Sequence, residues 1–392
     1  MHLIKYLSFT LISLSILAQA NSTELLSKVK QNIYENEKKI NELNSDTLEN
    51  SWINSIVGSF SYKNSDSRGD REETNTFSIT LNQPIFKSGG IYYAIKYANA
   101  NREFLKITTN FSEQTDKKIV LGALYNLKKL NLQIQKQLYM IENAKIDILR
   151  KKEQYKSGFL DSSFLNNAIL TKSSLQRSLL DMKSNRLDLI KTLKTYSNKN
   201  IEDIKLPNFT LLDKTEFLKK SLLLKQKNSE IVKNNYLKKM TISNYLPTVS
   251  FNAGYYDTRD YGKNRYNTFG LSVSMPLIDP NRSKNIEIKK LTYLKSKLEF
   301  QNTKKAETEN FDLAIKKIDL IKQKVLLTKK SLKLYDSLLL STKDSFRAGE
   351  KTIYDVDTLE NSKKTMALDI KIFKLDIQLS LLDLYAKMNG KI

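Results

Sequence analysis

The chain has 392 residues and a formal net charge of +23, with 65 Lys+Arg against 42 Asp+Glu, no cysteine and one histidine. The absence of cysteine excludes disulfides, thiolate catalysis and cysteine-based zinc sites. Because the histidine is His2 and no glycine-rich phosphate loop precedes a helix, we expect no enzyme activity, no cofactor and no metal site.

Residues 1–20 have the pattern of a secretory signal peptide. His2 and Lys5 form the polar start, an apolar run follows, and the run ends in the small-x-small cleavage site Ala18-Gln-Ala20. The apolar run is too short for a stable membrane anchor. We expect the mature chain to begin at Asn21, with a net charge of +22 (64 − 42) after the loss of Lys5.

Two similar units are predicted to follow the signal. The first, residues 21–205, should contain a helix, two strands and a long helical hairpin, at 21–50, 51–62, 74–86 and 91–197. The second, residues 206–392, should contain the same elements at 211–245, 247–257, 266–278 and 281–388. Apolar residues alternate with polar ones in the strands, as at Phe77, Ile79 and Leu81, and this period of two indicates a sheet with one apolar face.

Proline and glycine mark the junction between strand and helix in each unit. Pro84 precedes Gly89 and Gly90, and Pro276 precedes Pro280, which we expect at the first position of a helix. Pro84 and Pro276 are 192 positions apart (276 − 84). The spacing indicates a duplicated unit of roughly 190 residues, which is much longer than the unit of a solenoid.

The helical hairpins carry heptad repeats and turn at glycines. The repeats are Val120, Leu127, Ile134, Ile141 and Ile148 in the first hairpin, and Leu313, Leu320, Leu327 and Leu334 in the second. Such repeats indicate coiled-coil packing. The predicted turns at Gly158 and Gly349 are 191 positions apart (349 − 158), close to the spacing of the prolines. A helix of about 60 residues extends roughly 90 Å.

The predicted strands have the length of tilted transmembrane β-strands, about 9–11 residues. Aromatic residues near their ends, such as Trp52, Tyr62 and Tyr255, resemble the interfacial girdle of a membrane barrel. Four strands cannot close a barrel, and hydrocarbon does not tolerate unpaired strand edges. If the sheet lies in a membrane, several copies of the chain must therefore combine their strands.

The order of two strands, a proline, a very long helix, a glycine turn and a second long helix, present twice, resembles the TolC-like outer membrane efflux protein family. The resemblance covers nearly all of the mature chain. It implies a mainly α fold with a small β part, in a homotrimer whose twelve strands form a β-barrel continued by an α-helical barrel. It also implies an outer membrane protein that extends into the periplasm.

The resemblance further implies a function and partners. The protein would be the exit duct of a tripartite efflux or type I secretion system, a passive conduit driven by an inner membrane transporter. Its partners would be a periplasmic adaptor protein, an inner membrane pump of the RND or ABC type, and outer membrane lipid.

Site residues follow from the same resemblance. In the family, the helical tips face the adaptor, and the matching residues here are Ser157, Gly158, Phe159, Ala348, Gly349 and Glu350. Aspartates beyond the second turn narrow the closed entrance, and Asp355, Asp357 and Lys351 match this periplasmic gate. Phe164 departs from the pattern, because some relatives have a partner aspartate there, so we expect a weaker lock or one made by Asp161. A purely structural role for Asp355 and Asp357, as acidic residues that favour the first turn of a helix, stays open.

Two other functions explain parts of the sequence. A secreted periplasmic coiled-coil adaptor or scaffold would account for the signal and the heptads, but not for four membrane-length strands at matching positions in two units. A basic coiled coil that binds nucleic acid would require that residues 1–20 are not a signal. Because the lysines are spread along the helices without a binding motif, we expect no nucleic acid partner.

Overall fold

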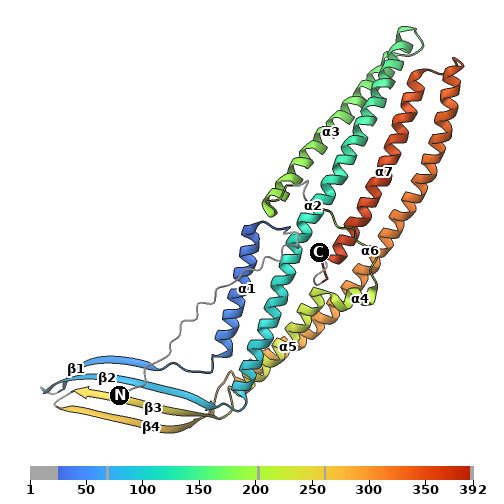
Figure 1. Ribbon diagram of the computed structural model, residues 1–392. Helices are drawn as coiled ribbons and strands as arrows, with labels where there is room; N and C mark the ends of the chain where they lie inside the picture. Colours follow the sequence, from blue (N-terminus) through green and yellow to red (C-terminus); the bar gives the residue numbers. More distant parts are fainter. Residues whose placement is uncertain (1–24, 68–69, 201–203, 260–261, 389–392) are drawn as a thin grey trace, which may run out of the picture.

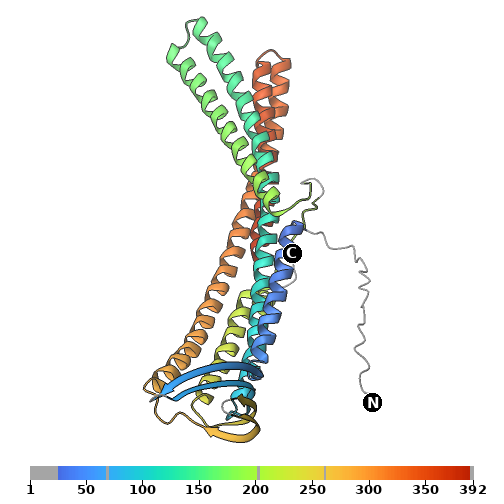
Figure 2. The same ribbon diagram turned by 90° about the vertical axis from the view of Figure 1, so that its left-hand side faces the viewer.

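The structure is a long, narrow body with a sheet at one end and helical hairpins reaching away from it (Figure 1 and Figure 2). The computed structural model describes residues 25–67, 70–200, 204–259 and 262–388. The predicted signal peptide, residues 1–20, lies outside the described residues. Among the helices of the described part, none is both long enough and apolar enough to cross a bilayer.

Two units with a similar order of elements follow each other along the chain. The first contains α1 (Lys28–Glu49), β1 (Val57–Ser67), β2 (Asp70–Phe86), α2 (Gly90–Lys156) and α3 (Ser162–Tyr196). The second contains α4 (Lys214–Lys220), α5 (Leu222–Ser243), β3 (Thr248–Arg259), β4 (Lys263–Ser274), α6 (Arg282–Arg347) and α7 (Ile353–Tyr385). With 67 and 66 residues, α2 and α6 are each about 100 Å long at 1.5 Å per residue.

The described strands form one antiparallel sheet in the order β1-β2-β3-β4. Each unit supplies one hairpin, and the central pairing of β2 with β3 runs from Asn75↔Arg259 to Phe86↔Val249. The two units are therefore joined by the middle of the sheet, and β1 and β4 are its outer strands. A mainly helical chain with a small antiparallel sheet was predicted from the sequence, and this prediction is confirmed.

The first hairpin is shifted relative to the prediction. β1 runs from Val57 to Ser67 and not over 51–62, because residues 51–53 form a turn after α1. The pairing with β2 continues through the polar residues to Ser67↔Asp70. Backbone pairing in a hairpin needs no apolar side chains, so the strands extend beyond the alternation that predicted them.

The second hairpin is shifted for the same reason. Its polar residues pair as far as Arg259↔Lys263, although they were predicted as a loop. β4 ends at Ser274, opposite Thr248, which is the first residue of β3. The last residues of the predicted strand 266–278 therefore have no partner strand in the part of the chain that the structure describes.

The helix predicted over 211–245 is interrupted at Ser221 and forms α4 and α5. The Ser221 hydroxyl accepts a hydrogen bond from the Leu224 amide and caps α5. Ser221 also forms an isolated β-bridge with Met388, and the Leu222 amide donates to the Lys387 carbonyl at 2.8 Å. The segment after α7 thus satisfies backbone groups that the interruption leaves without helical partners.

The helices lie side by side in one layer (Figure 1). In the half of the body away from the sheet, neighbouring helices follow the order α3–α2–α7–α6, and next to the sheet they follow the order α1–α2–α5–α6. The chain is therefore a wall with two edges. We call β1, α1 and α3 the first edge, and β4 and α6 the second edge.

The main hydrophobic core lies around the middle of α2. Val120, Leu121 and Leu124 are almost fully buried there, packed in one cluster with Leu381 and Leu382 of α7. Removing such side chains from water stabilises a fold by about 1.5–3 kcal/mol each. This core holds the two units together at mid-length, far from the sheet.

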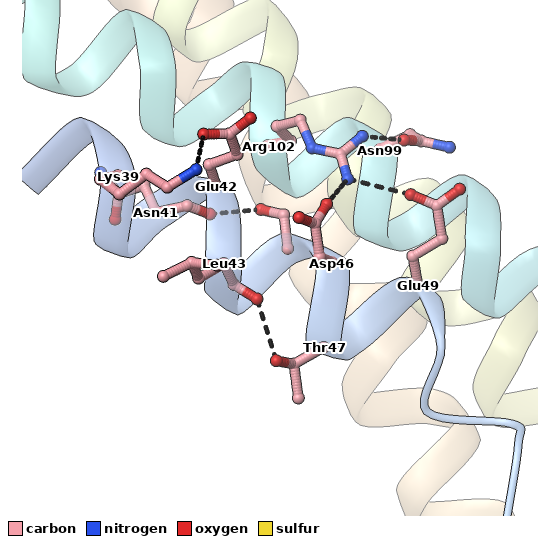
Figure 3. A network of polar contacts seen from close by, with 10 residues as sticks. Lys39, Asn41, Glu42, Leu43, Asp46, Thr47, Glu49, Asn99 and Arg102 are labelled. Carbon is pink, nitrogen blue, oxygen red and sulfur yellow. Dashed lines mark hydrogen bonds and ion pairs between the residues drawn. The ribbon is translucent and has the colours of Figure 1, made fainter. Parts of the chain in front are cut away.

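Polar contacts fasten α1 to α2 near the sheet (Figure 3). Arg102 of α2 donates to Asp46 and Glu49 of α1 at 2.7 and 2.9 Å, and to Asn99 in its own helix at 2.6 Å. The hydrogen bond to Glu49 is the largest cause of the raised pKa of Arg102. These contacts fix the end of α1 just before the chain enters the sheet.

Candidate functional site

The two hairpins turn at the end of the body farthest from the sheet, and both turns have the same backbone geometry (Figure 1). Gly158 (φ 75°) and Gly349 (φ 80°) lie in the left-handed region that favours glycine. The amides of the next residues, Phe159 and Glu350, each donate to a carbonyl in the last turn of the preceding helix at 2.9 Å. This is a Schellman motif, which ends a helix and satisfies its last carbonyls.

The residues predicted to contact an adaptor occupy these two turns. All six are exposed: Ser157, Gly158, Phe159, Ala348, Gly349 and Glu350. Phe159 is the largest of them and is 82 % exposed. The structure brings the six residues to one end of the molecule, and their contact with an adaptor stays a prediction.

The carboxylate of Asp355, predicted as a gate residue, is engaged within the chain. One oxygen accepts hydrogen bonds from the amide and the hydroxyl of Thr352, at 2.9 and 2.8 Å, at the start of α7. The other oxygen accepts from Arg150 of α2 at 2.9 Å. The amide and hydroxyl bonds of Thr352, and then the charges of Arg150 and Lys351, lower the pKa of Asp355. Asp355 therefore caps α7 and joins it to α2.

The pair Arg150–Asp355 is the outermost member of a series that we call the α2–α7 ladder. From mid-body to tip, its members are Lys129–Asp376 (2.7 Å), Lys136–Asp369 (2.7 Å), Asn143–Ser362 (3.3 Å) and Arg150–Asp355 (2.9 Å). Successive members lie seven positions apart on both helices. The contacts thus follow the seam between the two hairpins at heptad spacing.

This ladder was not predicted from the sequence, although the spacing of its charged residues is visible there. Three basic residues of α2 share one heptad position, and so do three aspartates of α7. The spacing alone does not show that these two helices are neighbours, because α2 and α7 belong to different hairpins. The pairing becomes visible only when the order of helices in the wall is known.

The other predicted gate residues lie near Asp355 but are not part of the ladder. Lys351 and Asp357 are exposed, and no described residue forms an ion pair with either. Asp161, the alternative lock residue, accepts a hydrogen bond from the Ser163 amide at 2.8 Å and caps α3. Phe164 is exposed in the first turn of that helix. Of these predicted gate residues, Asp355 is the one with a polar contact to the other hairpin in the described part of the chain, its 2.9 Å pair with Arg150.

The first strand-to-helix junction depends on both of its glycines. Pro84 lies where the pairing of β2 with β3 shifts register, beyond the part of β2 that pairs with β1. Gly89 adopts a left-handed conformation (φ 83°) directly before α2. Gly90 is buried, and a Cβ there would lie 2.7 Å from the Ser243 hydroxyl of α5. One glycine allows the turn, and the other allows α5 to approach.

The second junction differs from the prediction. Pro276 follows the end of β4, and α6 begins at Arg282, so Pro280 is not at the first helical position. The Asp279 carboxylate accepts from the Asn281 amide at 2.8 Å, and its carbonyl accepts from the Arg282 amide at 3.1 Å. The Asp-Pro pair therefore makes a turn that precedes the helix, which is a common use of these residues.

The two faces of the sheet differ in chemistry. Directly paired residues share a face, and the register gathers on one face Phe60, Phe77, Ile79, Leu81, Phe251, Ala253, Tyr255, Phe269, Leu271 and Val273. The opposite face carries mostly small or polar residues and one stacked pair of tyrosines: Ser59, Ser61, Ser78, Thr80, Ser250, Asn252, Gly254, Gly270 and Ser272, with Tyr256 and Tyr266. We call these the apolar face and the polar face. Both faces lie outside the helical core, and on the apolar face Phe60, Phe77 and Phe269 are exposed whereas Phe251 and Tyr255 are half-buried.

Large apolar side chains are also exposed along the helical edges of the wall. On α6, the heptad leucines Leu313, Leu320, Leu327 and Leu334 are 51 to 62 % exposed. The first edge has corresponding residues: Val29, Ile33, Ile40 and Leu43 on α1, and Leu170, Leu180 and Leu187 on α3. The heptad of α2, in contrast, is largely buried inside the wall. Among the described residues of its own chain, the α6 heptad is therefore covered only in part.

A four-stranded sheet extended by paired long helices in this order is the fold of TolC-like outer membrane channels, so the predicted resemblance in fold is confirmed. Among solved structures, the Campylobacter jejuni outer membrane channel CmeC aligns with a TM-score of 0.75 and 15 % identity, over 94 % of this chain and 84 % of CmeC. Vibrio cholerae VceC aligns with a TM-score of 0.72 and 13 % identity, over 90 % and 91 %.

The Neisseria gonorrhoeae channel MtrE, solved in its open state, aligns with a TM-score of 0.63 and 10 % identity, over 93 % of this chain and 87 % of MtrE. No protein-family model and no curated protein matches the chain by sequence. At these identities the likeness establishes the fold. CmeC and MtrE are outer membrane channels.

Proposed function

We propose that the protein is the outer membrane channel of a tripartite efflux or type I secretion system. Three copies would combine their sheets into a twelve-stranded β-barrel in the outer membrane, and their helices would continue it as a tunnel across the periplasm. The channel would be a passive exit duct, driven by an inner membrane transporter of the RND or ABC type. A periplasmic adaptor would connect the transporter to the helical tips.

The observation that carries this proposal is the wall with two unlike edges. The first edge exposes β1 and the apolar stripes of α1 and α3, and the second exposes β4 and the leucine stripe of α6. Joining the first edge of one copy to the second edge of the next is a head-to-tail contact, which closes into a ring when the rotation allows it. Such a ring would pair the outer strands and cover the leucines in one step.

The chemistry of the sheet gives the ring an inside and an outside. In a membrane barrel, apolar side chains face lipid and polar side chains face the lumen. The apolar face would therefore lie outward and the polar face inward. An open four-stranded sheet cannot stay in hydrocarbon, because its edge amides and carbonyls would be unsatisfied. Two copies would supply eight strands and three would supply twelve; we propose three because the chain shares its fold with TolC-like channels.

The gate is proposed at the helical tips. It differs from a gate in which the aspartates of the three chains simply surround the entrance. Because both oxygens of Asp355 are engaged, this residue would act as a latch between α2 and α7 within each chain. Asp357 and Lys351 are exposed next to it and would face the entrance or the neighbouring copy. Opening would separate the tips of the two hairpins, which requires that the Arg150–Asp355 pair breaks.

The proposal is tested by purifying the protein from the outer membrane fraction in detergent. We expect a homotrimer by light scattering and discrete conductance steps in planar bilayers. A matched variant, Leu320→Glu with Leu327→Glu, should abolish both, because it places charges in the α6 stripe. Extraction of the wild type by carbonate or salt, with no conductance, would instead support a periplasmic adaptor or scaffold.

A further inference from the structure

Basic side chains gather on the apolar face where β3 and β4 end, away from the helices, and on the neighbouring strands the same face continues with the pair Asn64↔Glu73. Arg259 pairs directly with Lys263, and Asp257 with Arg265, so these four side chains project from this face. The side chains of Arg259 and Arg265 are 64 % and 54 % exposed, and Lys263 is also exposed. On the same face, Phe60 and Phe77 lie on the side of Arg259 and Lys263 that is nearer the helices, and both rings are exposed. The cluster therefore marks the boundary between an apolar surface and a polar one.

Among the four side chains of these two pairs, the one carboxylate is that of Asp257, and only one of its two oxygens accepts a hydrogen bond. Oδ2 of Asp257 accepts from Nε of Arg265 at 3.0 Å, and Nε of Arg259 is 3.9 Å from Oδ1. Oδ1 is buried and has no hydrogen-bond partner among the described residues. Buried polar atoms normally have a partner. The site thus presents cations together with an acceptor that lacks a donor.

Asp257 also lines a cavity on this face. Phe60, Asn75, Phe77, Asp257 and Arg259 line a hollow of about 450 Å³. A ligand that fits this lining needs an anionic group for the guanidinium, an O–H or N–H donor for the carboxylate, and apolar parts for the two rings. Guanidinium groups match phosphate oxygens in geometry and charge. A phosphorylated sugar that carries acyl chains has all three features.

We propose that this cluster binds the headgroup of a phosphorylated glycolipid. The inference rests on the proposed function, because the outer membrane orientation places this end of the apolar face at the outer surface of the bilayer. The phosphates would bind Arg259 and Lys263, a sugar hydroxyl or amide would donate to Asp257, and the acyl chains would follow Phe60 and Phe77 along the face. The glycolipid would thereby seal the barrel at its outer rim.

The test uses the full-length oligomer in detergent, with native mass spectrometry as the readout and diphosphorylated lipid A, phosphatidic acid and inorganic phosphate as probes. Wild type should prefer lipid A to phosphatidic acid, which has a phosphate but no sugar donors. Arg259→Gln with Lys263→Gln should weaken lipid A binding about 25-fold, or about fivefold for each cation removed. Lys63→Gln is the matched control, because Lys63 is exposed at the same level on the opposite face. It should change the affinity less than about twofold.

The inference would be overturned by equal affinity in the double variant and wild type, by an equal loss in Lys63→Gln, or by equal binding of phosphatidic acid and lipid A. Inorganic phosphate that displaces lipid A at similar concentrations would also count against a lipid ligand. Conductance is measured on every sample. A wild type that conducts without preferring lipid A refutes only this inference, whereas a wild type that neither assembles nor conducts refutes the proposed function.

Discussion

Arg150→Gln is the perturbation that acts most directly on the latch at the tip. It removes the 2.9 Å pair with Asp355 but leaves the bonds from Thr352 that cap α7. The Arg150 and Asp355 side chains are 38 % and 29 % exposed, so solvent screens the pair and its contribution is on the order of 1 kcal/mol. Losing about 1 kcal/mol raises the ratio of open to closed tips about fivefold in one chain. If the three tips of a trimer open together, the ratio rises about a hundredfold.

Single-channel recording in planar bilayers measures the effect. Arg150→Gln should increase the conductance or the open probability at low salt, and the difference from wild type should shrink at high salt, which screens the wild-type pair. Lys129→Gln is the control, because it removes a 2.7 Å pair of the same ladder near mid-body. It should leave the conductance unchanged. A wild-type conductance for Arg150→Gln, or equal opening by Lys129→Gln, would refute the latch.

Four further predictions address separate features. Gly349→Ala should loosen the α6–α7 tip by about 1–2 kcal/mol, because alanine is strained at φ 80°; hydrogen exchange around the turn should accelerate, and unchanged protection would contradict the strain argument. Lys387→Met deprives the buried carboxylate of Glu307 of its 2.8 Å partner and should cost about 3 kcal/mol in denaturant unfolding. A loss below about 1 kcal/mol, the value expected for an exposed pair, would argue against it. Leu327→Glu should convert trimers to monomers in light scattering, and a persistent trimer would exclude the α6 stripe as an interface. Because the folded-state pKa of Asp355 is below its ordinary 3.8, the stability it contributes is complete above that value and is lost as pH falls through the lowered pKa. The conductance should therefore begin to rise, as the tips open in acid, only below about pH 4. A rise that begins near pH 6 would indicate that another group controls the opening.

The long helices and the paired strands were predictable because their signals are local. Heptad leucines, a glycine at each turn and period-two alternation all act within a few residues of the structure they specify. The α6 heptad shows the limit of such signals. Its spacing predicts a packed seam, but Leu313 and Leu327 are exposed in the single chain. The sequence indicates that a partner helix exists without indicating which chain supplies it.

The ends of elements and the role of Asp355 were less predictable, for physical reasons. Hairpins continue to pair through polar residues, so side-chain pattern does not mark their ends, and Pro280 forms a turn because Asp279 captures the following amides. Asp355 could be recognised as a residue near a helix start. Its bond to Arg150 joins positions 205 residues apart and depends on the packing of two hairpins. No local pattern contains that information.

Crosslinking the two edges of the wall tests the central claim most directly. The chain contains no cysteine, so a disulfide can form only between introduced residues. Cysteines are placed in pairs, one along β1 around Ser61 and one along β4 around Ser272. Within one chain, β1 and β4 are three strand spacings apart, about 14 Å, which is beyond the reach of a disulfide. We predict that some pairs give covalent species that end at three chains, whereas monomers for every pair, or a ladder that continues beyond three, would contradict the closed trimeric ring.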